Sequence, residues 1–252
     1  MNAVILLLIY HRNPLLEAGL ASIAKQGVQI EIWVLDEGEK GDAQQIAERF
    51  DARYLWTART KPRPDYWRVP GFAINVAAKR TSADLLILSC PEIYHVQNDT
   101  LARLVRPLEG DPEYRGICTC DGRDDKGAYS RALRENAGDP IALEAAWNEC
   151  PPLRMELPFL MAMRRQEFVS IGGYDEDFTG QSFDDDDLVN RLRDNGCALH
   201  KTDAQCVHLL HQRNDPSRME AGRLEHNEKL YRERRGQIVR NVGSDWGAWP
   251  DG

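Results

Sequence analysis

The strongest constraint on the fold is an alternation of short apolar runs with amphipathic helical segments along the first third of the chain. In the second run, Val28, Ile30, Ile32 and Val34 recur at every second position, which is typical of a strand. The expected strands are residues 3–10, 28–34, 52–56 and 84–88, and the expected helices begin at Asn13, Asp42 and Gly71. This β-α-β-α-β-α-β order predicts an α/β fold with a mostly parallel central sheet, flanked by helices and joined by right-handed crossovers.

The ends of these strands are the first places to look for a site. Ligands of open parallel sheets bind beyond the carboxyl ends of the strands. Here those ends carry Tyr10-His11, Asp36-Glu37 and the segment 89–92, which reads Ser-Cys-Pro-Glu. Glu92 is well placed to hold a metal bound to a phosphate-containing substrate. An ordinary turn carboxylate would explain Glu92 equally well, and a polar strand-end turn is the plainer explanation of Asp36 and Glu37.

The second half of the chain is more mixed. Strands are expected at residues 116–120 and 159–163, and helices at 101–108, 183–195 and 216–240. The polar stretch 121–152 contains one expected helix, opening at Asp139-Pro140, and is a suitable place for an acceptor site. We expect one domain over residues 1–215, made of halves 1–95 and 96–215, followed by a helical tail over 216–252.

Charge and composition exclude several classes of protein. The formal net charge of −8 disfavours a surface built to bind nucleic-acid backbone. The longest apolar run, residues 3–10, is far shorter than the roughly 20 residues of a membrane span, and no cationic stretch precedes it as in a signal peptide. Six cysteines without a CxxC pair predict free thiols and a cytoplasmic protein rather than a zinc ribbon.

The most informative segment is the acidic run from Gly172 to Leu188. Four consecutive carboxylates, Asp184 to Asp187, stand where a helix is expected to begin. Free N–H groups at a helix start favour anions, but adjacent carboxylates repel one another, so at least one pKa should rise towards the range of a general base. A solvated acidic cap is the plainer interpretation.

A calcium-binding loop is a further interpretation of the same acidic segment. The residues at positions 1, 3, 5, 6 and 12 of the EF-hand pattern would be Asp175, Asp177, Thr179, Gly180 and Asp186. Position 8 is polar and position 12 lacks the usual Glu, so the match is poor.

Two histidines form a second candidate group. His208 and His211 lie three residues apart in CVHLLHQR and could bind a metal through neutral imidazole, although isolated histidines are more often structural. The chain has no GxGxxG, Walker, GxSxG or HExxH motif, which excludes simple dinucleotide-binding, P-loop, serine-hydrolase and zincin functions.

In this order, the segments resemble a family 2 glycosyltransferase with the GT-A fold, from about Val4 to Arg213. The matching segments are LLLIYHRNPLLEAGLASIAKQG, IEIWVLDEG, PGFAINVAAKRTSADLLIL, GGYDEDFTGQSFDDDDLVNRL and CVHLLHQR. Two features depart from the family pattern. Where the Asp-x-Asp metal motif should follow the strand, the residues are Ser89, Cys90, Pro91 and Glu92, and a subset of related sequences carries a Pro-Glu at this place. Gln181 stands where the family has the Trp of Gly-Trp-Gly.

The resemblance implies an inverting transfer of a sugar from a nucleotide diphosphate sugar to a hydroxyl of a glycan or another acceptor. By the resemblance, Asp185 would be the general base, with Asp184 beside it. Mn²⁺ or Mg²⁺ would be held by Glu92, His208 and His211. The residues expected around the nucleotide and its phosphates are Tyr10, Asp36, Glu37, Asn75 and Lys79.

Three alternatives remain open from the sequence. The chain could be a catalytically inactive nucleotide-sugar-binding domain, since the Asp-x-Asp motif is missing. It could be a calcium-stabilised structural domain of the same fold. It could also transfer a sugar to DNA, although its acidic charge disfavours that acceptor. The transfer hypothesis requires Glu92, Asp185 and His208, which are far apart in the chain, to meet at one pocket.

Overall fold

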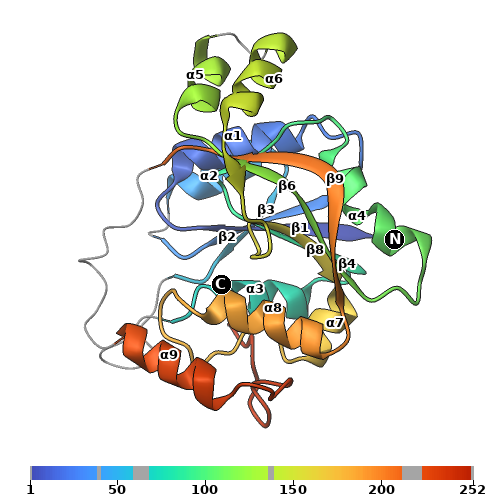
Figure 1. The fold of residues 1–252 in the computed structure, drawn as a ribbon. Helices are drawn as coiled ribbons and strands as arrows, with labels where there is room; N and C mark the ends of the chain where they lie inside the picture. The colour runs from blue at the N-terminus through green and yellow to red at the C-terminus, as the bar shows by residue number, and fades with distance from the viewer. Residues whose placement is uncertain (1, 39–40, 59–67, 136–138, 212–222, 251–252) are drawn as a thin grey trace.

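A computed structural model describes residues 2–38, 41–58, 68–135, 139–211 and 223–250 of the chain. Within these ranges nine strands form one sheet in the order β3-β2-β1-β4-β8-β6-β9-β5, with β7 paired to β6. Helices cover both faces of the sheet, and the pair α5–α6 projects from the body at the top of Figure 1. The expected α/β architecture is therefore confirmed.

The first half of the chain folds as its sequence predicts. Its elements are β1 (Ala3–Ile9), α1 (Asn13–Ile23), β2 (Glu31–Asp36), α2 (Asp42–Arg49), β3 (Arg53–Trp56), α3 (Gly71–Arg80) and β4 (Leu85–Ser89). Strand β1 lies between β2 and β4 and is parallel to both, so the carboxyl ends of all three strands meet at one edge. The second strand starts later than expected because the ladder begins where Val4 pairs with Glu31.

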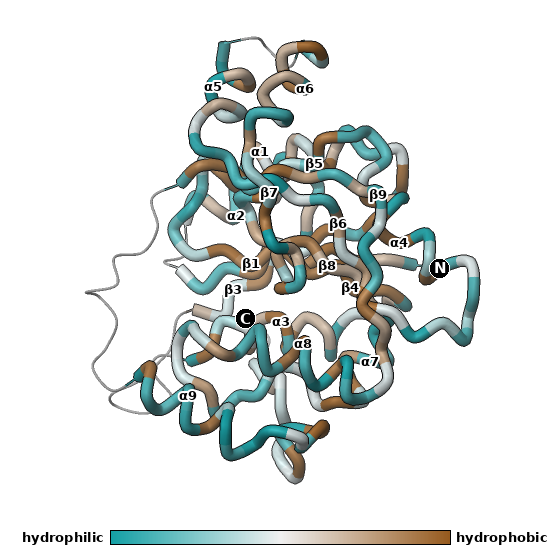
Figure 2. Tube along the Cα trace, in the orientation of Figure 1, coloured by the Kyte–Doolittle hydropathy of each residue, from teal (hydrophilic) through white to brown (hydrophobic). Residues whose placement is uncertain are grey.

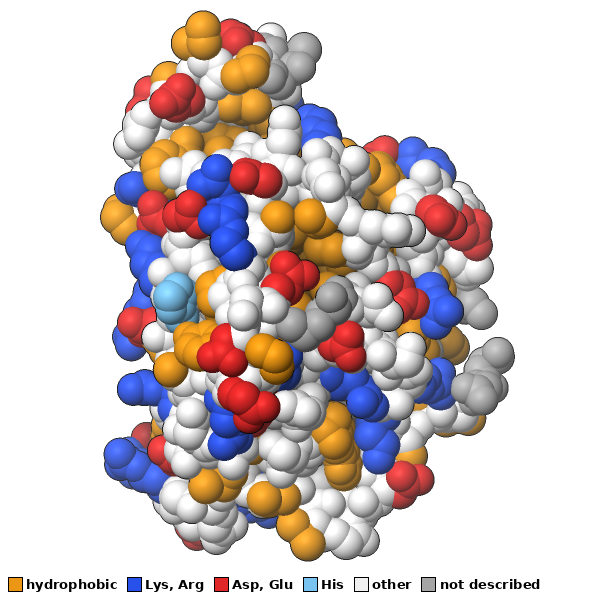
Figure 3. All heavy atoms as spheres, turned by 90° about the vertical axis from the view of Figure 1, so that its right-hand side faces the viewer, with side chains coloured by type: hydrophobic (Ala, Val, Ile, Leu, Met, Phe, Trp, Pro, Cys, Tyr) orange, Lys and Arg blue, Asp and Glu red, His pale blue; other side chains and the backbone are white. Residues whose placement is uncertain are grey.

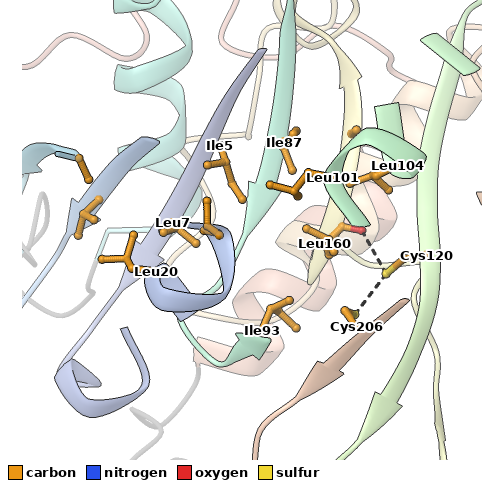
Figure 4. Close-up of a cluster of buried hydrophobic side chains, with 14 of the residues drawn as sticks. Ile5, Leu7, Leu20, Ile87, Ile93, Leu101, Leu104, Cys120, Leu160 and Cys206 are labelled. Atoms are coloured by element: carbon orange, nitrogen blue, oxygen red, sulfur yellow. Dashed lines mark hydrogen bonds between the residues drawn. The ribbon is translucent and has the colours of Figure 1, made fainter. Parts of the chain in front are cut away.

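The core has two layers because side chains alternate along the central strands. Ile5 and Leu7 of β1 pack with Leu20 of α1 on one face, whereas Val4 and Leu6 pack with α3 on the other. Brown segments in Figure 2 show that the apolar residues concentrate in the sheet and on the inner sides of the helices. Figure 4 shows part of the first layer, where Ile5, Leu7 and Ile87 point toward side chains of other elements.

The second half adds antiparallel strands to the parallel half. Its elements are β5 (Ile93–His95), α4 (Thr100–Gly110), β6 (Gly116–Asp124), α5 (Ala128–Glu135), α6 (Pro140–Glu149), β7 (Pro152–Leu153), β8 (Leu160–Arg164), α7 (Arg165–Ser170), α8 (Asp184–Asp194), β9 (Ala198–His208) and α9 (Arg223–Glu233). Strand β8 is antiparallel to β4 and to β6, and β6 is parallel to β9. Strand β9 in turn holds β5 in antiparallel register.

The stretch 121–152 is more regular than its polar sequence predicts. Strand β6 continues to Asp124 because β9 pairs with it along most of its length, across a bulge after Thr119. A helix that the sequence did not predict, α5, follows. The buried carboxylate of Asp125 accepts hydrogen bonds from the backbone N–H groups of Gly127, Tyr129 and Ser130, which starts this helix.

The C-terminal helix is shorter than expected. Of the helix predicted over residues 216–240, α9 covers 223–233, and residues 216–222 lie outside the described ranges. After Gly236, whose φ is 82°, the chain turns back onto the domain. There the buried guanidinium of Arg240 lies 2.9 Å from a carboxylate oxygen of Asp175 and 2.9 Å from one of Asp187. None of the described helices has the length and apolar character required of a membrane span.

Candidate active site

A cavity of about 380 Å³ opens at the carboxyl ends of β1 and β4. Tyr10 and Arg12 contribute to its wall from the end of β1, and Cys90 and Glu92 from the end of β4. The start of α8 closes it from the other side with residues 182–186. Its size falls in the range typical of small-molecule sites, and its position is the one where parallel sheets bind ligands.

Glu92, His208 and His211 form a compact group beside this cavity. Strand β5 brings them together, since Ile93 pairs with His208 and the N–H of Leu209 donates to the carbonyl of Glu92 over 2.8 Å. Oxygen Oε1 of Glu92 lies 3.8 Å from Nε2 of His208 and 3.6 Å from Nε2 of His211. All three ligand atoms lie within 4.8 Å of one another, the spacing of a metal site.

The groups around Glu92 and His208 favour an ionised Glu92 and an imidazole whose Nε2 is directed at it. Nδ1 of His208 lies 3.3 Å from a carboxylate oxygen of Asp124, which leaves Nε2 directed at Glu92. Burial alone would raise the pKa of Glu92, but the neighbouring imidazole of His208 and the charge of Arg12 outweigh burial and hold that pKa below its usual range. Glu92 is therefore ionised at neutral pH although it is buried.

Two carboxylates line the opposite wall at the start of α8. The buried Asp184 accepts a hydrogen bond from the N–H of Ser182 over 2.9 Å, and the half-buried Asp185 accepts one from the hydroxyl of Tyr174, also over 2.9 Å. Burial raises the pKa of Asp184, and the charge of Asp185 raises it further. Burial also raises the pKa of Asp185, against the opposing effect of the Tyr174 hydrogen bond. The pair thus titrates closer to neutral pH than ordinary aspartates do.

The loop that precedes α8 has an uncommon backbone conformation. Ser182 and Phe183 adopt positive φ angles of 108° and 65°, which cost free energy in residues other than glycine. The side chain of Asn227 in α9 holds this loop, because its amide donates to the carbonyls of Thr179 and Ser182 over 2.9 and 3.0 Å. Helix α9 therefore fixes the direction in which Asp184 and Asp185 enter the cavity.

Of the residues expected around a nucleotide, only Tyr10 and Glu37 line this cavity among the described residues. The carboxylate of Asp36 instead accepts hydrogen bonds from the N–H of Gly38 and the hydroxyl of Tyr54. Lys79 lies outside the lining as well, with its ammonium 4.7 Å from the centre of the Trp246 ring.

Asn75 also lies outside the cavity, but it supports a residue of the cavity wall. Its amide is fully buried, accepts from the N–H of Tyr174 over 2.8 Å and donates to the carbonyl of Tyr174 over 2.9 Å. Asn75 therefore fixes the backbone of Tyr174, whose hydroxyl reaches Asp185.

Two acidic residues of the calcium-loop pattern, Asp175 and Asp177, are paired with arginines. Arg234 donates to both Asp175 and Asp177 over 2.6 Å, and Arg240 also lies against Asp175. Within the described ranges, the group with metal-site spacing is Glu92, His208 and His211, which includes neither aspartate.

Sequence reasoning missed three residues of the site. Arg12, which forms an ion pair with Glu92, could have been found from its place directly after the first strand. Tyr174 stands in the acidic run but carries no charge to mark it. Asp124 could not have been found, because the sequence predicted that the strand ended before it.

The chain is similar to known proteins in part of its sequence and in its fold. A family model described as the N-terminal domain of galactosyltransferase matches residues 158–215, which include α8 and β9. No curated protein matches the chain.

Among the solved structures that are similar to the chain are the following three. A mannosyltransferase from Pyrobaculum calidifontis, in complex with GDP-Man and Mn²⁺, is 19% identical with a TM-score of 0.57 over 84% of this chain and 58% of its own. Glucosyl-3-phosphoglycerate synthase from Mycobacterium tuberculosis, in complex with Mn²⁺, UDP and glucosyl-3-phosphoglycerate, is 16% identical with a TM-score of 0.60 over 96% of this chain and 82% of its own. GalNAc-T7, with UDP, GalNAc and Mn²⁺, is 12% identical with a TM-score of 0.64 over 92% and 48%. The chain therefore has the GT-A fold of glycosyltransferases, as its sequence predicted.

Proposed function

We propose that this protein is a metal-dependent glycosyltransferase that moves a sugar from a nucleotide diphosphate sugar to an acceptor hydroxyl with inversion. The observation that carries the proposal is that Glu92 and Asp185, from distant parts of the chain, line one cavity at the carboxyl edge of the sheet, while His208 and His211 meet Glu92 beside it. The three similar structures contain a nucleotide or a nucleotide sugar together with Mn²⁺, which supports the same type of donor here.

The donor atoms of the proposed metal site fit a divalent cation. Glu92, His208 and His211 would hold it through one carboxylate oxygen and two imidazole nitrogens. This mixed set suits Mn²⁺ better than Mg²⁺, which prefers oxygen ligands. When bound, the cation would neutralise the negative charge that develops on the diphosphate leaving group.

Residues of the chain itself would accept the proton of the acceptor hydroxyl and bind the donor. In its ionised form, Asp185 would accept the proton of the acceptor hydroxyl, and the hydroxyl of Tyr174 would orient this carboxylate. Asp184, whose pKa is raised, would limit the negative charge beside it. Tyr10 and Glu37 would contact the nucleotide from the ends of β1 and β2.

We further propose that the acceptor is a glycan or another molecule with a free hydroxyl, rather than DNA. Among the described residues of the cavity wall, carboxylates outnumber cationic side chains. On the face shown in Figure 3, acidic and basic side chains are interspersed, without the continuous basic stripe that a DNA backbone requires.

The six free thiols support a location in the reducing cytoplasm.

Release of nucleoside diphosphate tests the proposed activity. Incubation with UDP-, GDP- and dTDP-sugars should release the nucleoside diphosphate from at least one donor when Mn²⁺ is present. The rate should be about tenfold lower with Mg²⁺ and negligible with EDTA, because two of the three proposed ligands are imidazoles. If the protein binds a donor but releases no nucleoside diphosphate with acceptors of several classes, it is instead an inactive nucleotide-sugar-binding domain. Stabilisation by Ca²⁺ in preference to Mn²⁺ would indicate a structural calcium site.

The pH dependence of transfer should respond to Tyr174. Activity should rise with pH as Asp185 loses its proton. The Tyr174 hydrogen bond favours the ionised form of Asp185 and lowers its pKa, so Tyr174→Phe raises that pKa. We expect the acidic limb of the kcat/KM profile to move to higher pH by about one to two units, since a hydrogen bond to a charged group contributes roughly 1.5–3 kcal/mol. Tyr94→Phe, which removes a hydroxyl bonded to Lys25 outside the cavity lining, is the matched control. An unchanged profile in the Tyr174 variant would contradict the assignment of Asp185.

A further inference from the structure

The charges around the cavity leave one residue without an assigned role. The described cavity wall carries five carboxylates, and the only Lys or Arg side chain among its described residues is Arg12. The carboxylates are Glu37, Glu92, Asp184, Asp185 and Asp186. A diphosphate entering this wall would be repelled by those carboxylates that are ionised, so each positive charge at the wall matters for binding.

Arg12 lies at the junction between the metal-site group and the cavity. It directly precedes α1, at the carboxyl end of β1, and its guanidinium Nη1 donates to Oε1 of Glu92. Its side chain keeps 25% of its surface exposed, whereas that of Glu92 keeps 5%. Arg12 thus meets a buried carboxylate on one side while remaining open to the cavity.

The oxygen that Arg12 occupies is the one that a metal would need. Oε1 of Glu92 is the atom that faces Nε2 of His208 and Nε2 of His211. A cation held by this set would lie close to the guanidinium, and the two positive charges would repel each other. Among the described residues, Glu92 is the only ion-pair partner of Arg12, so no second carboxylate holds the guanidinium in place.

We propose that Arg12 is a donor-binding residue that exchanges partners: it neutralises Glu92 before the metal binds and contacts the donor diphosphate afterwards. The inference rests on the proposed metal and nucleotide sites. A guanidinium suits this role because its planar set of N–H donors matches either a carboxylate or a phosphate. The side chain is flexible and faces the cavity, so the exchange requires rotation of its own bonds and no movement of the fold.

Two calorimetric titrations test this exchange without relying on activity. In the first, Mn²⁺ is titrated into nucleotide-free protein, and Arg12→Gln should bind Mn²⁺ at least about tenfold more tightly than the wild type, because a competing cation is removed. In the second, UDP and GDP are titrated into Mn²⁺-saturated protein, and the same variant should bind the preferred nucleotide at least about tenfold more weakly. The opposite signs of these two changes are the signature of the exchange.

Two further variants guard against indirect effects. Arg12→Lys keeps the charge but loses the planar donor set, so its Mn²⁺ affinity should stay near that of the wild type while nucleotide binding weakens. Arg103→Gln removes the same charge at a surface ion pair with Asp99 and Asp203, and should change neither affinity.

The outcomes separate the exchange from the proposed function. If Arg12→Gln weakens Mn²⁺ binding, Arg12 only orients Glu92 and the exchange is wrong. The exchange is also wrong if nucleotide affinity is unchanged in that variant. Wild-type protein that binds neither Mn²⁺ nor a nucleotide would overturn the proposed function, and the exchange with it.

Discussion

Replacement of Asp185 by Asn is expected to lower sugar transfer by about 10²- to 10⁴-fold, the usual contribution of a general base. Asn has nearly the same shape as Asp, and its carbonyl oxygen can still accept the hydrogen bond from Tyr174. It cannot accept a proton from the acceptor hydroxyl. The loss should therefore appear in kcat, with donor and metal affinities nearly unchanged in calorimetry.

The stability of this variant provides an independent check. Because the folded protein raises the pKa of Asp185, ionisation of this residue reduces stability as the pH rises from its unfolded pKa to its folded one. At pH 7 the neutral Asn should therefore melt at the same temperature as the wild type or higher. Asp194→Asn, an exposed change near the other end of α8, is the matched control and should retain full activity. Full activity of Asp185→Asn would remove this residue from the base role.

The second large effect is expected from Glu92→Gln, which removes the only carboxylate from the proposed metal set. Mn²⁺ affinity should fall by more than about 100-fold, because loss of an outer-shell partner alone typically costs 10- to 100-fold. Transfer should fall with it, and Mn²⁺ should no longer raise the melting temperature.

The fold of the Glu92 variant must be checked separately, since Arg12 would lose its charged partner. Circular dichroism and the melting temperature without metal provide this check. Glu113→Gln, an exposed substitution of the same kind, serves as the control. Unchanged Mn²⁺ affinity in a folded Glu92→Gln protein would show that the metal binds elsewhere.

The parallel half of the fold could be predicted because its information is local. Period-2 apolar runs and helix start signals each act within about ten residues, and together they restrict the topology to few possibilities. The second half depends on pairing between distant segments. That β6 extends to Asp124 follows from its pairing with β9, some 80 residues later in the chain, and no local pattern encodes this contact.

In the candidate site too, the residues marked by local sequence signals could be predicted, and those that depend on long-range pairing could not. Glu92 and Asp185 could be selected because carboxylates at a strand end and a helix start have a recognisable chemistry. The convergence of His208 and His211 on Glu92 depends on the pairing of β5 with β9. The sequence of the short strand Ile93–His95 does not predict this pairing. The buried amide of Asn75 holds the backbone of Tyr174, about 100 residues later in the chain, and no local pattern encodes this contact.

The replacement of the Asp-x-Asp motif also has a physical consequence. Cys90 lines the cavity together with Glu92 and Asp185, and burial raises the pKa of its thiol well above the ordinary value. The thiol is therefore neutral at pH 7 and supplies neither charge nor a thiolate ligand. The proposed metal site thus has Glu92 as its carboxylate and the imidazoles of His208 and His211 as its other ligands.

The most direct test of the account is a crystal structure of the protein with Mn²⁺ and its preferred nucleoside diphosphate, with anomalous diffraction measured near the manganese edge. The account predicts one strong anomalous peak coordinated by Glu92, His208 and His211, with the diphosphate between it and Asp185. An anomalous peak at Asp175 and Asp177, or a nucleotide bound away from the cavity at the ends of β1 and β4, would contradict it.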